Sequence, residues 1–334
     1  MIKDIQNKKV YVYCLASVVT GGCELLHQLV DFLNDNHRDA YIVYIGKGAK
    51  KVPEAYSAYN IKVANEIEDS EGAVVVLDEG FLYLADNFKK AHLIFWWLSV
   101  DNFYNTNYFS RIYRQYGVIH TLSGYLKGVF KNRTKYIKQA DINMYQSYYA
   151  KDFLKNNDVP ETKLKYLSDY VNDLYTANVS TALQHNKKDI VLYNPKKGYE
   201  FTSKLINASP SLKWIPLINL TNDQVKEKLM SSKVYVDFGT HPGKDRFPRE
   251  AAISGCCILT DKKGSAKFSR DVPISNEYKF EDEDKNISKI INKINFCLTN
   301  YDEAIDQFES YRKYILSEKK SFGLDCEKIF FIGE

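Results

Sequence analysis

The chain has 334 residues, of which 45% are hydrophobic, and it contains 46 lysines and arginines and 42 aspartates and glutamates. This length exceeds that of an ordinary single domain, and the apolar share is enough for two cores. A formal net charge of +4 does not by itself indicate a nucleic-acid-binding protein, so any basic function depends on local patches.

The first residues, the densest apolar stretch and the cysteines indicate in which compartment we expect the protein. The first residues carry Asp4 among lysines and have no small-residue cleavage site after a long apolar core, which favours a strand over a secretion signal. The densest apolar stretch, residues 91–100, is about half as long as a membrane-crossing helix. We therefore expect a cytoplasmic protein. The six cysteines lack metal-binding or C-x-x-C spacing, which predicts reduced core thiols and no metal site.

The first half alternates predicted strands and helices. An apolar run at residues 9–16 leads through Gly21 and Gly22 into a helix at 23–34 with leucines at helical spacing. Further strands are predicted at 41–45, 73–77, 92–98 and 142–146, with room for right-handed crossovers. The pattern predicts an open parallel sheet. Gly21 and Gly22 lack the full dinucleotide fingerprint, so they form either a tight turn or a backbone contact with a ligand.

One carboxylate follows the predicted strand at 92–98. Asp101 lies just beyond the carboxyl end of that strand, where open α/β sheets gather their catalytic groups. It is a candidate general base, and a helix cap is the alternative role.

Residues 102–140 contain no acidic side chain and many aromatic ones. Such a run is either a solvated face or a contact with an anionic membrane surface or a phosphorylated acceptor. We expect it to bring the protein to the cytoplasmic face of the membrane as a peripheral protein. Its basic residues are Arg111, Arg114, Lys127, Lys131, Arg133, Lys135 and Lys138.

The second half repeats the alternation after a polar linker at residues 176–188. A strand at 189–193 is followed by Asn194, Lys196, Lys197 and Gly198, and then by a helix at 199–207. A strand at 212–218 and a helix at 223–232, which begins with the capping pair Thr221 and Gln224, come next. The two lysines are either surface charge or part of an anion site at the carboxyl edge of the sheet.

Residues 234–266 organise this half. They read as a strand at 234–238, a loop rich in glycine and positive charge, a helix from about residue 247, and a strand at 257–260. Lys244, Arg246 and Arg249 fall within six residues at the start of that helix, whose free N–H groups and dipole also favour negative charge. A phosphate or diphosphate is the predicted ligand.

These motifs carry a resemblance to a known family. The sequences N-P-K-K-G and H-P-G-K-D-R-x-P-R-E-A-A-x-x-G-C-x-I-x-T, with a later G-S-A, resemble a bacterial GT-B glycosyltransferase of the group 1 or family 4 type over most of the chain. The resemblance implies an α/β fold of two Rossmann-like domains facing across a cleft. We expect an acceptor-side domain at residues 1–175, with a tail at about 310–334 packing back on it, and a nucleotide-binding domain at 186–309.

The resemblance also implies an activity and roles for residues. The chain would move a sugar, as a hexosyltransferase, from a nucleoside-diphosphate sugar to a glycan or lipid-linked acceptor in bacterial surface polysaccharide or glycoconjugate synthesis. Glu250 would hold the ribose hydroxyls, as an acidic residue does in dinucleotide folds. The turn of Gly264, Ser265 and Ala266 would lie beside the sugar and phosphates. The diphosphate would be neutralised by Lys196, Lys197, Lys244 and Arg246, without a metal or other cofactor.

The sequence departs from the family at one position. Many retaining members have a second glutamate eight residues before the position of Glu250, where this chain has Pro242 preceded by His241. The stereochemical outcome therefore stays open. His241 either contacts the donor or packs in the turn. Two other functions share the basic loops: a nucleotide-sugar epimerase, and a binding protein without turnover.

Overall fold

The computed structural model describes residues 2–105, 117–120, 122–123, 126, 134–177, 179 and 186–332. The chain divides into two compact units, Met1–Asp169 with Lys320–Glu334, and Tyr170–Lys319. Within the described residues, each unit contains one sheet, with seven strands in the first unit and four in the second, and every strand pair is parallel. The predicted α/β fold of two Rossmann-like units is confirmed.

The sheet of the first unit has the strand order β3-β2-β1-β4-β5-β6-β7. Its inner strands β1, β4, β5 and β6 are buried in near-continuous apolar runs, as a sheet with both faces covered requires. The elements are β1 (Lys9–Leu15), α1 (Gly21–Asp35), β2 (Ala40–Ile45), β3 (Lys62–Val63), β4 (Ala73–Asp78), β5 (His92–Trp97), α2 (Val100–Asn105), α4 (Thr134–Ile137), β6 (Ile142–Tyr145), α5 (Tyr148–Asn156) and β7 (Leu164–Tyr166).

Helix α1 shows how the sequence fixes these elements. The Thr20 side chain accepts a hydrogen bond from the Cys23 amide and so caps the helix. Leu25, Leu29 and Leu33, at helical spacing, are all buried. The predicted strands agree with the observed ones to within a residue or two, and the two-residue strand β3 was not predicted.

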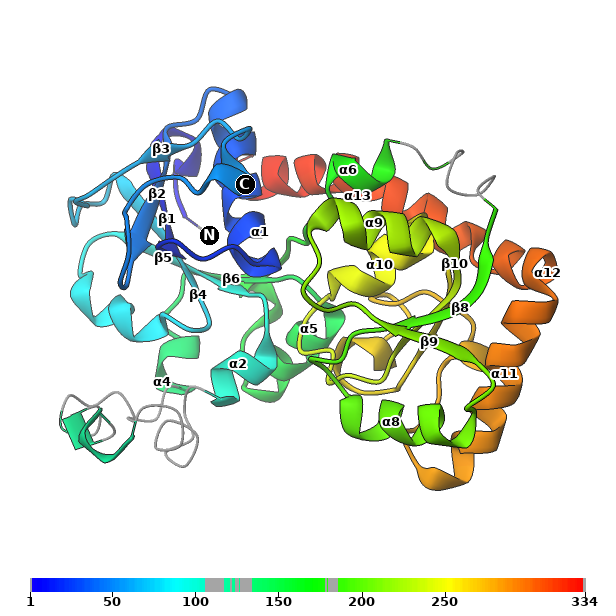
Figure 1. Cartoon of the computed structure of the whole chain (residues 1–334). Coiled ribbons are helices and arrows are strands. Elements are labelled where there is room, and N and C mark those ends of the chain that lie inside the picture. Colours follow the sequence, from blue (N-terminus) through cyan, green and yellow to red (C-terminus); the bar gives the residue numbers. More distant parts are fainter. Residues whose placement is uncertain are drawn as a thin grey trace. The chain divides into compact units, whose positions relative to one another are not determined.

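The sheet of the second unit has the strand order β11-β10-β8-β9. Helices α9 and α10 lie on one face, and α8 and α11 on the other (Figure 1). The elements are α6 (Asp173–Thr176), β8 (Lys188–Tyr193), α8 (Tyr199–Ala208), β9 (Lys213–Pro216), α9 (Asn222–Ser231), β10 (Ser232–Asp237), α10 (Arg246–Ile253), β11 (Cys257–Thr260), α11 (Ile287–Thr299) and α12 (Tyr301–Asp306). Strands and helices alternate from β8 to β11 as predicted, whereas α6 and α11 were not predicted.

The last helix, α13 (Glu309–Phe330), belongs to both units. Its first part packs in the core of the second unit through Tyr311 and Ile315. Its last turns contact the first unit, where the Phe330 carbonyl oxygen accepts a hydrogen bond from Arg38 Nη1 at 2.9 Å. Helices α12 and α13 are separate, and α13 continues to residue 330.

The observed division also differs from the predicted one at residues 170–175. Val171 and Tyr175 pack in the core of the second unit, so this unit begins before the polar linker. All six cysteines are buried thiols without disulfides. No helix in the described ranges is both long and apolar enough to cross a membrane.

Candidate functional site

Three loops meet at the carboxyl edge of the second sheet. They follow the neighbouring strands β8, β10 and β11, and two glycines let them approach closely. Gly198 has a φ of +63°, and a Cβ built on it would lie 1.9 Å from the Phe238 carbonyl oxygen. Gly264 has a φ of +49°, and its Cβ would lie 2.0 Å from the His241 carbonyl oxygen. Both positions therefore require glycine for backbone conformation and for space.

Hydrogen bonds join two of these loops directly. The Ser265 amide donates to the His241 carbonyl oxygen at 2.8 Å, and Ser265 Oγ donates to the Gly243 carbonyl oxygen at 2.6 Å. Ser265 and Ala266 are fully buried, so their side chains support the loops from inside. The Gly264 turn thus fixes the loop between β10 and α10.

The predicted anion-binding residues of helix α10 lie on two different faces of the helix. Arg246 begins the helix and Glu250 follows one turn later, so both lie on one face, and both are partly exposed. Arg249 lies on the inner face and is fully buried. Of the predicted site residues on α10, Arg246 and Glu250 are therefore the two that are partly exposed, and Arg246 Nη2 is itself buried.

Lys244 and Arg249 instead form a buried ion cluster with Glu318 of α13. Lys244 Nζ lies 2.8 Å from Glu318 Oε1 and donates to the Tyr314 hydroxyl at 2.9 Å. Arg249 Nη1 lies 2.9 Å from Glu318 Oε2, and its Nη2 donates to the Lys244 carbonyl oxygen at 3.0 Å. The predicted phosphate-binding cations are thus paired with a carboxylate inside the protein. Glu318 was not among the predicted site residues.

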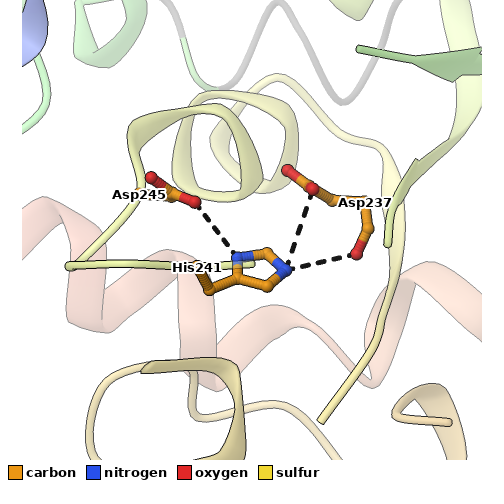
Figure 2. A group of neighbouring side chains, drawn as sticks. All are labelled: Asp237, His241 and Asp245. Carbon is orange, nitrogen blue, oxygen red and sulfur yellow. Dashed lines mark hydrogen bonds and ion pairs between the residues drawn. The ribbon is translucent and has the colours of Figure 1, made fainter. Parts of the chain in front are cut away.

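The His241 side chain is also buried, between carboxylates from three loops or strand ends. Its Nδ1 lies 3.2 Å from Asp245 Oδ2, and its Nε2 lies 3.2 Å from the Asp237 carbonyl oxygen and 3.7 Å from Asp237 Oδ1 (Figure 2). Asp261 Oδ1 lies 3.4 Å from the same Nε2. The ring is 0% exposed and contacts protein groups, so its position fits packing in the turn.

Charge dominates the titration of this cluster. Burial lowers the pKa of His241, but the Asp237, Asp245 and Asp261 carboxylates outweigh burial and raise it to about 9. Burial raises the pKa of Asp261 to about 7, against the opposing effect of His241. At neutral pH His241 is therefore an imidazolium, and Asp261 is near the midpoint of its titration.

Asp237, His241 and Asp245 lie close enough together to hold a metal ion. The two nitrogens of the ring face different carboxylates. Asp237 faces one ring nitrogen and Asp245 the other, whereas a single ion binds only one of these nitrogens. An imidazolium, which carries a proton on each nitrogen and a positive charge, suits this arrangement. A ligated histidine must be neutral, and the three carboxylates oppose that state.

The loop after β8 supplies the remaining predicted cations. The Asn194 side chain accepts a hydrogen bond from the Lys196 amide at 3.0 Å and shapes the loop, while the Lys196 side chain is exposed. Lys197 Nζ lies 2.8 Å from Asp245 Oδ1. Lys197 and His241 therefore share Asp245, which lies just before α10.

In the first unit, Asp101 lies in the first turn of α2 and accepts a hydrogen bond from the Tyr149 hydroxyl at 3.2 Å. The Ser99 side chain, and not Asp101, accepts the Asn102 amide. Gly21 and Gly22 are the first residues of α1, at the carboxyl end of β1. These residues lie at the edge of the sheet where they were predicted.

A buried carboxylate at this edge, Glu79, was missed. Glu79, which follows β4, accepts hydrogen bonds from the Leu98 amide at 2.9 Å and from Asn102 Nδ2 at 3.3 Å. Burial raises its pKa to about 7. The strand-end sequence Asp78-Glu79-Gly80 was the available signal, because it follows a buried strand just as Asp101 does.

Most of the predicted basic segment lies outside the described residues, namely Arg111, Arg114, Lys127, Lys131 and Arg133, and Lys135 is described only as part of α4. Lys138 is exposed, and its Nζ lies 3.3 Å from Asp158 Oδ2. Within the described part of the segment, four aliphatic side chains are 57% to 84% exposed: Val118, Ile119, Leu122 and Leu126.

No protein-family model and no curated protein matches the sequence. Solved structures match nearly the whole chain. Anabaena Alr3699/HepE in complex with UDP and glucose is 11% identical and has a TM-score of 0.65, over 96% of this chain and 99% of that one. A sucrose-phosphate synthase (tll1590) from Thermosynechococcus elongatus is 10% identical, with a TM-score of 0.64 over 97% of this chain and 98% of that one.

A glycosyltransferase from Rickettsia africae is 14% identical, with a TM-score of 0.57 over 97% of both chains. Identities this low leave the individual residues of these proteins without a transferable role here, while the structures match along nearly the full length. The chain has the GT-B fold of these glycosyltransferases.

Proposed function

We propose that the chain is a glycosyltransferase that moves a sugar from a nucleoside-diphosphate sugar to an acceptor hydroxyl. One observation carries the proposal: the loops after β8, β10 and β11 are in close contact at one sheet edge, with the partly exposed Arg246 and Glu250 on one face of α10. Open α/β sheets bind their ligands at this edge. The structurally similar HepE binds UDP and glucose, which supports a uridine diphosphate donor.

Sugar transfer of this kind is favoured by positive charge beside the leaving group. The bond between the anomeric carbon and the diphosphate oxygen breaks, and the acceptor oxygen bonds to that carbon and gives up its proton. Negative charge grows on the departing nucleoside diphosphate, where fixed cations stabilise it. Arg246 can bind a phosphate with two parallel hydrogen bonds, and Lys196 and Lys197 lie in the neighbouring loop.

Glu250 completes the donor site in this proposal. A partly exposed carboxylate one helical turn after Arg246 can accept hydrogen bonds from two ribose hydroxyls while Arg246 holds the phosphates. Lys244 and Arg249 act indirectly, since Glu318 pairs with both. We propose that this donor chemistry needs no metal.

The test is a thermal-shift screen with UDP, GDP, CDP and ADP, followed by transfer assays with the matching nucleotide sugars. A ligand that binds only the folded protein raises its melting temperature. We expect UDP to give the largest shift and its sugars to be transferred. Interconversion of the free nucleotide sugar would indicate an epimerase instead, and binding without any turnover a binding protein.

For the acceptor, we propose a glycan or lipid-linked molecule at an anionic membrane surface, on the cytoplasmic face. The support is the basic segment at residues 102–140 together with its exposed aliphatic side chains, Ile119 and Leu126 above all. Apolar side chains can insert between lipid headgroups, and lysines and arginines attract anionic lipids. The role in surface polysaccharide or glycoconjugate synthesis belongs to the same proposal.

A further inference from the structure

We propose that His241 is a positioning residue whose positive charge holds the loop between β10 and α10 in the shape that binds the donor diphosphate. The residue touches no ligand in this role. It acts through the backbone of residues 238–245, which leads into Arg246. The inference rests on the proposed donor site, and it adds a function for a side chain that is itself 0% exposed.

The side chain of His241 joins the ends of three elements. Asp237 ends β10, Asp245 precedes α10, and Asp261 follows β11, and all three face the ring. Two of these carboxylates also contact other side chains. Lys197 Nζ forms an ion pair with Asp245, and the Tyr235 hydroxyl donates a hydrogen bond to Asp237 Oδ2 at 3.0 Å. Charges therefore alternate across the sheet edge from the β8 loop to the β11 loop.

The backbone of His241 makes a second connection. Its φ is +44°, a left-handed conformation that few residues with a side chain adopt. Its carbonyl oxygen accepts the Ser265 amide and lies where a Gly264 side chain would otherwise be. A strained backbone of this kind persists only where its surroundings hold it, and here the ring contacts provide that hold.

Only the charged ring fits these surroundings. A neutral imidazole has one donor and one acceptor nitrogen, so one of its nitrogens would face a carboxylate without a proton between them. The carboxylates would also lose the cation that separates them, and they would repel each other and an incoming diphosphate. Removing the charge should therefore loosen the loop and weaken donor binding together.

The experiment compares His241→Asn with His37→Asn. Asparagine tolerates a positive φ, and His37 is an exposed histidine with a φ of +61° in the first unit, so it is a matched control. We expect His241→Asn to weaken UDP binding by at least tenfold in calorimetry and to raise the KM for the donor more than it lowers kcat. His37→Asn should leave both unchanged.

A compensating variant separates charge from packing. In His241→Asn/Asp237→Asn the Asp237 carboxylate that faces the ring is also replaced by a neutral amide, so we expect this double variant to regain at least threefold of the lost UDP affinity. Equal or weaker binding by the double variant, or wild-type affinity in His241→Asn, would overturn the inference.

Two measurements do not depend on donor binding. Nitrogen-15 NMR of the wild-type protein at pH 8 should show both His241 nitrogens protonated, and a neutral ring there would contradict the proposal. Hydrogen exchange should show faster exchange of the Ser265 amide in His241→Asn than in wild type. If the wild-type protein binds none of the four nucleotides, the proposed function fails, while unchanged exchange at Ser265 is the result that removes the positioning role.

Discussion

Glu318 accepts a hydrogen bond from Arg249 at 2.9 Å, although the two residues are 69 positions apart in the chain. Its other oxygen lies 2.8 Å from Lys244 Nζ. One carboxylate of the last helix thus neutralises two buried cations of the loop and helix that precede β11. This pairing makes Glu318 a residue on which both the stability of the second unit and the shape of the proposed donor site depend.

We expect Glu318→Gln to destabilise the protein strongly. The substitution keeps the shape of the side chain but leaves Lys244 and Arg249 buried without their anion, a loss that costs about 3–5 kcal/mol in buried pairs. In a protein of this size the melting temperature should fall by on the order of 10 °C. Glu309→Gln, on the same helix with a solvent-exposed ion pair to Lys313, is the control and should change it little. Equal melting temperatures for the two variants would contradict the role of the cluster.

Arg246→Ala should lower turnover by a factor on the order of a hundred or more while the protein stays folded. The reason is that the guanidinium is proposed to bind charge that grows on the leaving diphosphate. Steady-state kinetics with the nucleotide sugar found in the screen measure the effect. Lys213→Ala removes an exposed cation at the amino end of β9, far along the strand from the site edge, and should leave turnover unchanged. Wild-type turnover in a folded Arg246→Ala protein would remove Arg246 from the donor site.

Chelation should leave most of the activity in place. The proposed site uses cationic side chains where other transferases use a divalent ion, and the nitrogens of His241 already face carboxylates. Activity is measured after dialysis against EDTA, and again after addition of manganese or magnesium. Complete loss that either ion restores would show that a metal takes part, with Asp237 and Asp245 as the first candidates for its ligands.

The contribution of His241 to stability should depend on pH in a defined direction. Its folded-state pKa of about 9 lies above the ordinary value of 6.5, so its contribution is complete below about pH 6.5 and is lost as the pH rises through 9. A shift of this size corresponds to roughly 3 kcal/mol. Denaturant unfolding of wild type and His241→Gln should give a stability difference that shrinks between pH 6.5 and 9.5. A difference that is constant across this window would show that the ring does not titrate there and would contradict a folded-state pKa of about 9.

The protein should sediment with vesicles that contain anionic lipid, and this binding should weaken with salt. Each lysine or arginine near such a surface adds about 1 kcal/mol of attraction. Replacing Lys131, Arg133 and Lys135 with glutamate should reduce sedimentation and leave nucleotide binding unchanged. A variant with the same change in charge, Lys47, Lys50 and Lys51 to glutamate, alters exposed lysines elsewhere in the first unit and serves as the control. Equal loss in both variants would point to net charge instead of a specific surface.

The sequence was sufficient to predict most strands and the loops that follow them. Buried parallel strands are apolar throughout, and glycines with positive charge mark the loops, so β10, α10 and β11 were placed nearly as observed. Arg246 and Glu250 could be expected to share a face because they are one helical turn apart.

The burial and ion pairing of the other charged residues could not be predicted from the local sequence. Lys244 and Arg249 both pair with Glu318, which lies on a helix about 70 residues later in the chain. The sequence around the two cations does not indicate this partner. His241 is likewise buried by Asp261, which the strand β11 brings beside it. In both cases a long-range contact decides whether a charge serves a ligand or the protein itself.

The shared helix α13 has a consequence for how the chain folds during synthesis. Arg38 is buried in the first unit and donates to the carbonyl oxygens of Ile5, Lys8 and Phe330, while a side chain on Gly323 would meet the ring of Phe32 at 3.0 Å. The core of the first unit is therefore complete only after the ribosome has added residues some 150 positions beyond the last strand of that unit. The second unit, Tyr170–Lys319, is continuous and can close its core first, which reverses the usual order in which domains fold as they emerge.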